Sequence, residues 1–175
     1  MQSVSRFSRI SFVTGNIAML AGAIDPLEGS IVILLGGGLI LFGTYFGNVT
    51  RRFLILRIWV FILLIAGVAA LWGLSALGGF GGTSELSNWW GLLILPYPIG
   101  WFMSIWAPDS PRWVLWSGIG VGVWYLAMPI LLTMIRDTVQ LEELGIAVIV
   151  LGATGILIIT GCIMRLRKSN VIASH

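Results

Sequence analysis

Few residues in this sequence could do acid–base, nucleophilic or metal chemistry. The only histidine is His175, the only cysteine is Cys162, and the seven acidic residues fall between apolar segments. A zinc site, a haem held by two histidines and a Ser-His-Asp set each need residue types that the sequence does not supply at a suitable spacing. We therefore expect no catalytic residue, no metal site and no enzyme activity, and we interpret the acids as solvated turn residues.

The segment LLILPYPIGW is the most suggestive candidate for a binding function. Pro96 and Pro98 each lack a backbone N–H, so a helix must kink or break around Tyr97. In membrane transporters a broken helix exposes backbone carbonyls to a solute. Pro96, Tyr97 and Pro98, with the Asn16 amide nearby, form the candidate solute site. The alternatives are a simple proline kink and an Asn16 side chain that bonds across helices.

A second candidate site consists of three arginines at the start of the third apolar run. Arg51 and Arg52 precede this run, and Arg57 lies about one turn inside it. The long side chain of Arg57 can extend its charged end to the membrane surface. Because basic clusters beside a membrane attract anionic lipids, we expect these three residues to contact them.

The composition around these residues is typical of a helical membrane protein. Apolar residues make up 58% of the 175 residues and charged residues only 10%, and the mean hydropathy is +1.00. A bilayer core of ~30 Å requires about 20 apolar residues per helix. The apolar runs cover about residues 10–24, 30–47, 53–78, 89–107, 113–135 and 146–164. We predict an all-α fold in which residues 1–175 form one integral membrane domain with six transmembrane helices arranged as hairpins.

The charges predict the orientation of this domain. If the N-terminus is cytoplasmic and each run crosses, every basic residue except Arg136 lies on the cytoplasmic side. Such an excess of arginine and lysine is the usual mark of cytoplasmic loops, so both ends are expected inside. A bundle of four crossings, with the first hairpin or the proline-containing fourth run re-entrant, preserves the sidedness of most charges and stays open.

Glycine and tryptophan, with 23 and nine residues, suggest how the helices pack. Small residues allow close approach of helix backbones, either within the chain or against a partner subunit. The candidate packing or partner residues are Gly36, Gly43, Gly118, Gly120, Gly122 and Gly152. We expect leucine at Gly36 or Gly120 to disrupt packing. Most tryptophans, Trp101 included, bracket the fourth run as an aromatic belt. Trp59, Trp72 and Trp124 could line a cleft for a lipid or a carotenoid-type pigment.

Residues 29–52 align without gaps with residues 145–168, and nine of the 24 positions are identical. This match predicts a duplicated helical hairpin. The stretch GNIAMLAGAIDPLEGSIVILLGGGLILFGTYFG, residues 15–47, resembles the hairpin unit of the HdeD-like small membrane proteins. The resemblance implies a small six-helix inner-membrane protein associated with acid-stress resistance, and it supplies no mechanism.

Three function classes follow. The first is a non-catalytic accessory subunit of the bacterial inner membrane that packs against other membrane proteins or itself and holds lipid or pigment. The second is a small transporter or channel for a neutral solute, and the third is an HdeD-like acid-stress protein. A nucleic-acid partner is not expected, because the basic residues lie beside apolar runs.

Overall fold

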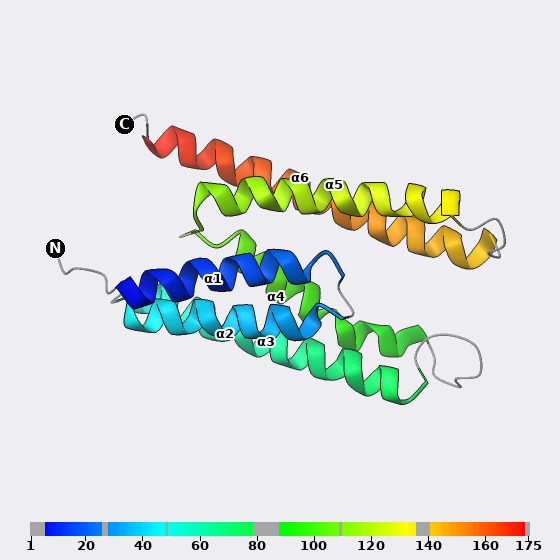
Figure 1. The fold of residues 1–175 in the computed structure, drawn as a ribbon, viewed down its shortest axis with the longest axis horizontal. Helices are drawn as coiled ribbons and strands as arrows, with labels where there is room; N and C mark the ends of the chain where they lie inside the picture. The colour runs from blue at the N-terminus through cyan, green and yellow to red at the C-terminus, as the bar shows by residue number, and fades with distance from the viewer. Residues whose placement is uncertain are drawn as a thin grey trace. The chain divides into compact units, whose positions relative to one another are not determined.

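In the computed structural model, every regular element of the described residues is helical (Figure 1). The structure describes residues 6–25, 28–47, 49–78, 88–108, 110–135 and 141–173. The elements are α1 (Arg6–Gly22), α2 (Ser30–Phe46), α3 (Arg51–Ala76), the 3₁₀ helix η1 (Asn88–Ile94), α4 (Pro96–Ile105), α5 (Arg112–Ile135) and α6 (Leu141–Ala173). Contacts divide the chain into two compact units, residues 1–109 and 110–175, and each is described by itself.

The six predicted apolar runs correspond to these helices, which confirms the all-α fold class. Five runs each coincide with one helix, within a few residues at most ends. The last helix, α6, is much longer than its predicted run of residues 146–164, because its helical backbone continues through the basic residues to Ala173. The fourth run is divided between η1 and α4.

Two helices in the described part of the chain are long and apolar enough to cross a membrane. They are α3, with 26 residues, and the Arg112–Leu131 stretch of α5, with 20 residues. At 1.5 Å per residue these lengths correspond to about 39 Å and 30 Å. Helix α2 and the Leu92–Ile105 stretch are apolar but shorter. The presence of these two helices is weak evidence for a membrane location.

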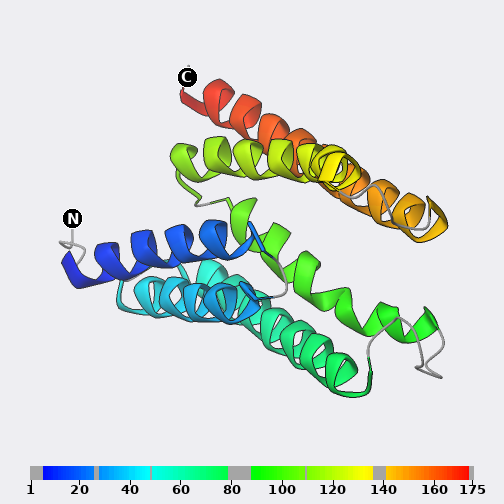
Figure 2. The ribbon, with the colours of Figure 1, turned by 45° about the vertical axis from the view of Figure 1, so that its right-hand side comes forward.

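Helices α1 and α2 form an antiparallel hairpin with very close backbones, and both ribbon views show them side by side (Figures 1 and 2). A Cβ on Gly36 would lie 2.8 Å from the Gly15 carbonyl oxygen and 2.9 Å from the Met19 nitrogen. Towards one end of the hairpin Gly22 faces Gly29, and towards the other end the Ser8 hydroxyl donates a 2.6 Å hydrogen bond to the Gly43 carbonyl.

Small residues therefore recur every seven positions on both helices of this hairpin. They are Ser8, Gly15 and Gly22 on α1, and Gly29, Gly36 and Gly43 at the start of and along α2. A period of seven keeps these residues on one stripe of each helix, because it is nearly two helical turns. The two stripes face each other, which allows the backbones to approach closely, and Ile33 and Ile40 of α2 pack against Gly22 and Gly15.

Helices α3 and α4 complete the core of the first unit. Leu64 of α3 packs over Gly37 of α2, and Gly67 of α3 lies directly against the backbone of Tyr97. Met19, Leu64 and Ile105 are fully buried where these helices meet α1 and α2. The contacts run antiparallel between α2 and α3 and between α3 and α4. As a result, the first turns of α1 and α3 and the last turn of α2 lie at one end of the unit (Figure 2).

The charges of this unit separate along the helices. Arg6, Arg9, Arg51 and Arg52 lie at the end where α1 and α3 begin, whereas Asp25 and Glu28 lie in the turn at the opposite end. The antiparallel packing thus collects residues that are distant in sequence into a basic end and an acidic end.

In the second unit α5 and α6 form another antiparallel hairpin. A Cβ on Gly155 would lie 2.7 Å from the Gly122 carbonyl oxygen, and one on Gly122 would meet Ile159 and Gly155. Pro129 is buried inside α5. Cys162 of α6 is also buried.

The aligned segments 29–52 and 145–168 do not share a packing register. Gly36 contacts α1, but a Cβ on its counterpart Gly152 would have no atom within 4 Å, and Gly155 makes the contact with α5 instead. Ile40 is 1% exposed, whereas its counterpart Ile156 is 59% exposed. Equivalent residues of the two segments therefore occupy different positions in their hairpins.

Candidate functional site

Arg57 lies inside the first unit, contrary to the expectation that its charged end reaches the membrane surface. The side chain is 2% exposed. Its Nη1 donates hydrogen bonds to the Ser104 carbonyl oxygen at 3.1 Å and to the Ser104 hydroxyl at 3.3 Å. The guanidinium carbon also lies 5.5 Å from the centroid of the Phe12 ring, within the range of a cation–π contact. Arg57 thus joins α1, α3 and α4.

The bond from Arg57 satisfies a carbonyl that α4 cannot satisfy itself. Ser104 lies in the last turn of α4, where carbonyls lose their partner in the next turn. The residue four positions on is Pro108, which has no N–H to donate. A positive charge at a helix C-terminus is also favoured by the helix dipole. The physical role of Arg57 in this structure is therefore to cap α4.

Trp101 makes a similar contact at the end of α1. Its Nε1–H donates a 3.0 Å hydrogen bond to the Met19 carbonyl oxygen. The amide of Ala23, which would bond Met19 in a continuing helix, donates to the Leu20 carbonyl instead. Trp101 is buried, so the prediction that it belongs to an interfacial aromatic belt is wrong. A buried indole needs an acceptor, and the end of α1 supplies one.

Asn16 bonds within its own helix, and the prediction of an interhelical bond is wrong. Its Nδ2 donates a 2.8 Å hydrogen bond to the Phe12 carbonyl oxygen one turn earlier. The side chain is fully buried, and Oδ1 accepts no hydrogen bond from the described residues. A buried amide oxygen of this kind is unfavourable, and it is an acceptor that a water or a solute donor would satisfy.

The fourth run changes from 3₁₀ to α-helical geometry at Leu95, just before the two prolines, and the Leu95 backbone itself keeps right-handed helical angles, so the predicted break around Tyr97 is not found. Helix α4 begins at Pro96, so both prolines lie in its first turn. Backbone N–H groups in a first turn have no partner within the helix, so neither proline removes a hydrogen bond there. Tyr97 is buried, and its backbone lies against Gly67. The candidate solute residues of the fourth run are therefore placed by close packing between α3 and α4, whereas Asn16 lies on α1.

The six candidate glycines divide into two groups. Gly36, Gly43 and Gly122 lie in tight helix contacts within their hairpins, and Gly118 is buried. By contrast, a Cβ on Gly120 or Gly152 would have no neighbour within 4 Å. A Cβ at Gly120 would thus meet no neighbour, so the structure supports the expected disruption at Gly36 and gives no packing reason for it at Gly120.

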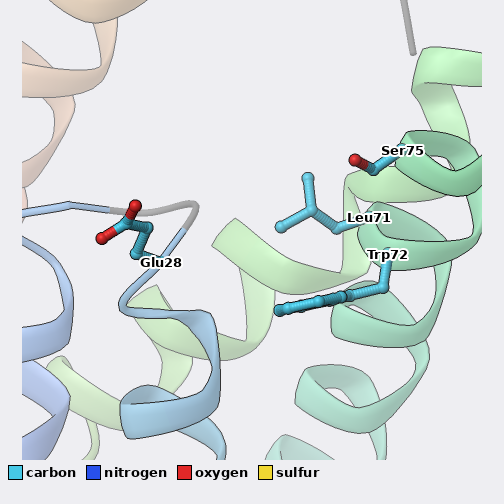
Figure 3. A pocket seen from close by; sticks show the side chains of 4 residues that line it. All are labelled: Glu28, Leu71, Trp72 and Ser75. Atoms are coloured by element: carbon cyan, nitrogen blue, oxygen red, sulfur yellow. The ribbon is translucent and has the colours of Figure 1, made fainter. Parts of the chain in front are cut away.

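A shallow pocket of about 210 Å³ opens between the α1–α2 turn and α3 (Figure 3). Glu28 lies on one side, and Leu71, Trp72 and Ser75 of α3 lie on the other. The Trp72 Nε1–H donates a 3.0 Å hydrogen bond to the hydroxyl of Ser30, which is fully buried at the start of α2. This bond fixes the indole at the edge of the pocket.

No family model, curated protein or solved structure matches this chain. The similarity of residues 15–47 to the HdeD-like hairpin therefore stays a prediction, since nothing in these comparisons bears on it.

Several residues of this arrangement were not anticipated from the sequence. The spacing of seven between Ser8, Gly15 and Gly22 is a signal that could have identified the contact face of α1. No such signal marks Ser104 or the partner of Trp101, because those contacts join residues 47 and 82 positions apart. Among the acidic residues considered, Glu85, Asp109 and Asp137 lie outside the described residues.

Proposed function

We propose that this chain is a non-catalytic integral membrane protein with six crossings and both ends in the cytoplasm, acting as an accessory subunit beside other membrane proteins. The main observation that supports this proposal is the surface of α3, where large apolar side chains are exposed along the whole helix. They include Ile55, Ile58, Trp59, Ile62 and Ile65. Soluble monomers rarely expose an apolar stripe of this length, whereas a helix surrounded by lipid does.

The separation of charges in the first unit supports the proposed orientation. The basic end carries Arg51 and Arg52, both exposed, and the acidic end carries Asp25 and Glu28. The positive end of a membrane bundle is normally cytoplasmic. In the second unit Arg112 begins α5 and Arg165, Arg167 and Lys168 lie in the second half of α6, so an antiparallel hairpin brings these charges to one end as well.

The accessory role is supported by helix faces of the second unit that are not packed within that unit. Gly120 on α5 and Gly152 on α6 meet no neighbour, and Trp116 is largely exposed. Glycine on an exposed helix face allows another helix to approach closely. The basic residues Arg51 and Arg52 would contact anionic lipid at the same membrane surface.

Native mass spectrometry after gentle detergent extraction from the source membrane tests this proposal. We expect co-migration with other membrane polypeptides, and an absorbance spectrum of the same fraction would report a bound pigment. A monomer or homo-oligomer without other polypeptides would contradict the accessory role.

A second candidate is a transporter of a neutral solute, which is favoured by the buried Asn16 Oδ1 that accepts no hydrogen bond from the described residues. Tyr97→Phe distinguishes the two functions, because it removes one hydroxyl from a buried residue beside Gly67. For an accessory subunit we expect unchanged thermal stability and unchanged partner association. Loss of solute flux in proteoliposomes containing this variant, with the wild-type chain active, would favour the transporter.

A further inference from the structure

The α5–α6 hairpin gathers basic residues at one of its ends. A Cβ on Gly155 would lie 2.7 Å from the Gly122 carbonyl oxygen, so these two residues lie at the same level of the antiparallel pair. Ten residues further towards one end, α5 begins at Arg112 and α6 carries Arg165. Both ribbon views show the start of α5 and the end of α6 at the same end of the hairpin (Figures 1 and 2). Arg112 and Arg165 therefore share one level, although they are distant in sequence.

Two further charges follow directly on α6. Arg167 and Lys168 are exposed, and neither forms an ion pair with another described residue. Helix α6 continues to Ala173, about 12 Å beyond the start of α5. Within residues 109–116 and 161–173 the only acid is Asp109, which lies outside the described residues, so positive charges dominate this end. We call these four positive residues the basic cluster: Arg112, Arg165, Arg167 and Lys168.

An exposed apolar side chain lies one helical turn inside three of these charges. Residues four apart in a helix share a face and are separated by about 6 Å along the axis. The surface of the hairpin thus changes from positive to apolar within one turn, on both helices. The pairs are Arg112 with Trp116, Arg167 with Ile163, and Lys168 with Met164, and all three apolar side chains are exposed.

This change of character distinguishes between possible anionic partners. An acidic protein segment or a nucleic acid would use the charges and leave the apolar turn uncovered. An anionic phospholipid matches both parts, because its headgroup can lie against the charges while its acyl chains cover the apolar side chains. A phosphatidylcholine headgroup also carries a phosphate, but its choline adds a positive charge that the cluster repels.

We infer that the basic cluster binds the phosphodiester headgroup of an anionic phospholipid, with the acyl chains against Trp116, Ile163 and Met164. An arginine guanidinium presents its donors in a planar fork that suits phosphate oxygens, and a lysine adds a compact positive charge. This site is additional to the lipid contacts proposed for Arg51 and Arg52 on α3. The inference rests on the proposed membrane location.

Site-resolved photocrosslinking tests the inference. The full chain is placed in nanodiscs of phosphatidylcholine that contain a few per cent of photoactivatable phosphatidylglycerol or, in a parallel sample, photoactivatable phosphatidylcholine. Crosslinked peptides are then mapped by mass spectrometry. We expect residues 112–116 and 163–168 to crosslink more to phosphatidylglycerol. Combining Arg167→Gln with Lys168→Gln should lower this crosslinking about five-fold for each charge removed.

The matched control combines Arg51→Gln with Arg52→Gln, which removes the same charge from α3. It should leave crosslinking at residues 112–116 and 163–168 unchanged. An equal loss there in both double variants would show a response to net charge alone and would overturn the site. Equal crosslinking of the two lipids would also overturn it, and would favour an acidic partner protein for the basic cluster.

The failure of this site can be distinguished from failure of the membrane proposal. The substituted residues are all exposed, and circular dichroism of each variant checks that helix content is preserved. A chain that inserts into nanodiscs without a preference for phosphatidylglycerol refutes this site alone. A chain that purifies without detergent and does not insert refutes the membrane proposal, and the lipid site with it.

Discussion

At the scale of single residues, Gly36 and Gly120 form a matched pair of helical glycines. A methyl group at Gly36 would come within 2.9 Å of the α1 backbone, whereas one at Gly120 would meet no neighbour. We expect Gly36→Ala to destabilise the protein by about 1–3 kcal/mol, because two helix backbones must separate. Gly120→Ala should be neutral or slightly stabilising. Thermal unfolding of both variants in the same detergent measures the difference, and equal effects would contradict the assigned packing.

Arg57 provides a second prediction at this scale. Replacement by methionine keeps an unbranched apolar side chain at this position but removes the guanidinium and both of its hydrogen bonds to Ser104. The Ser104 carbonyl cannot be removed with it, so a buried acceptor loses its donor. We expect Arg57→Met to cost about 1–3 kcal/mol of stability.

The control for Arg57 is Arg51→Met, because Arg51 is exposed on the same helix. Such a surface change should stay within about 0.5 kcal/mol. Chemical denaturation followed by circular dichroism gives both values. An Arg57→Met variant as stable as Arg51→Met would mean that the bonds to Ser104 contribute little.

At the scale of helices, Trp101 of α4 joins that helix to the end of α1. Trp101 donates to the last turn of α1, while Trp106, just after α4, has a buried Nε1 with no acceptor among the described residues. We expect Trp101→Phe to cost about 0.5–1.5 kcal/mol through the lost hydrogen bond. Trp106→Phe should cost less stability, because it removes a buried N–H donor that has no acceptor among the described residues.

Both residues are tryptophans in the same region of the chain and undergo the same substitution, so each variant is a control for the other. The unfolding temperatures of the two variants, measured under one set of conditions, show which substitution costs more stability. A larger loss for Trp106→Phe than for Trp101→Phe would contradict the role assigned to the bond with Met19.

For the whole molecule, the prediction concerns membrane topology: the two ends of α3 are expected on opposite sides of the membrane. Thr50 precedes α3 and Leu77 follows it, and both are exposed. In a Cys162→Ala background, we expect Leu77→Cys to be labelled from outside intact cells by a membrane-impermeant maleimide. Thr50→Cys should be labelled only after permeabilisation, because in the proposed topology α3, about 39 Å long, crosses the bilayer.

Ile24→Cys reports on the α1–α2 hairpin in the same experiment. The side chain is exposed just after α1, so we expect labelling from outside, as for Leu77→Cys. Labelling of Ile24→Cys only after permeabilisation would contradict two full crossings by this hairpin. Labelling of Thr50→Cys and Leu77→Cys from the same side would contradict the crossing by α3.

How far the sequence predicts this protein depends on the range of the interaction. Apolar runs predicted the helices because helix formation and burial of apolar surface are properties of neighbouring residues. The prolines of the fourth run predicted an irregularity for the same reason, and the structure has a change from 3₁₀ to α-helical geometry just before Pro96 and no break around Tyr97. The sites were less predictable. Asn16 was assigned an interhelical bond, and Arg57 a place at the membrane surface, because their partners could not be identified from local sequence.

By itself the sequence determined the helical class, the apolar segments and the charges at their ends, since each follows from residues close together in the chain. Only the tertiary structure decided that Gly36 faces Gly15 while Gly120 faces none, that Arg57 caps α4, and that Glu28 and Trp72 share a pocket. Those contacts depend on the rotation of each helix about its axis and on the register between helices. A change of one residue in either would turn a different face inward, and the apolar character of nearly every face leaves the sequence pattern unable to choose among them.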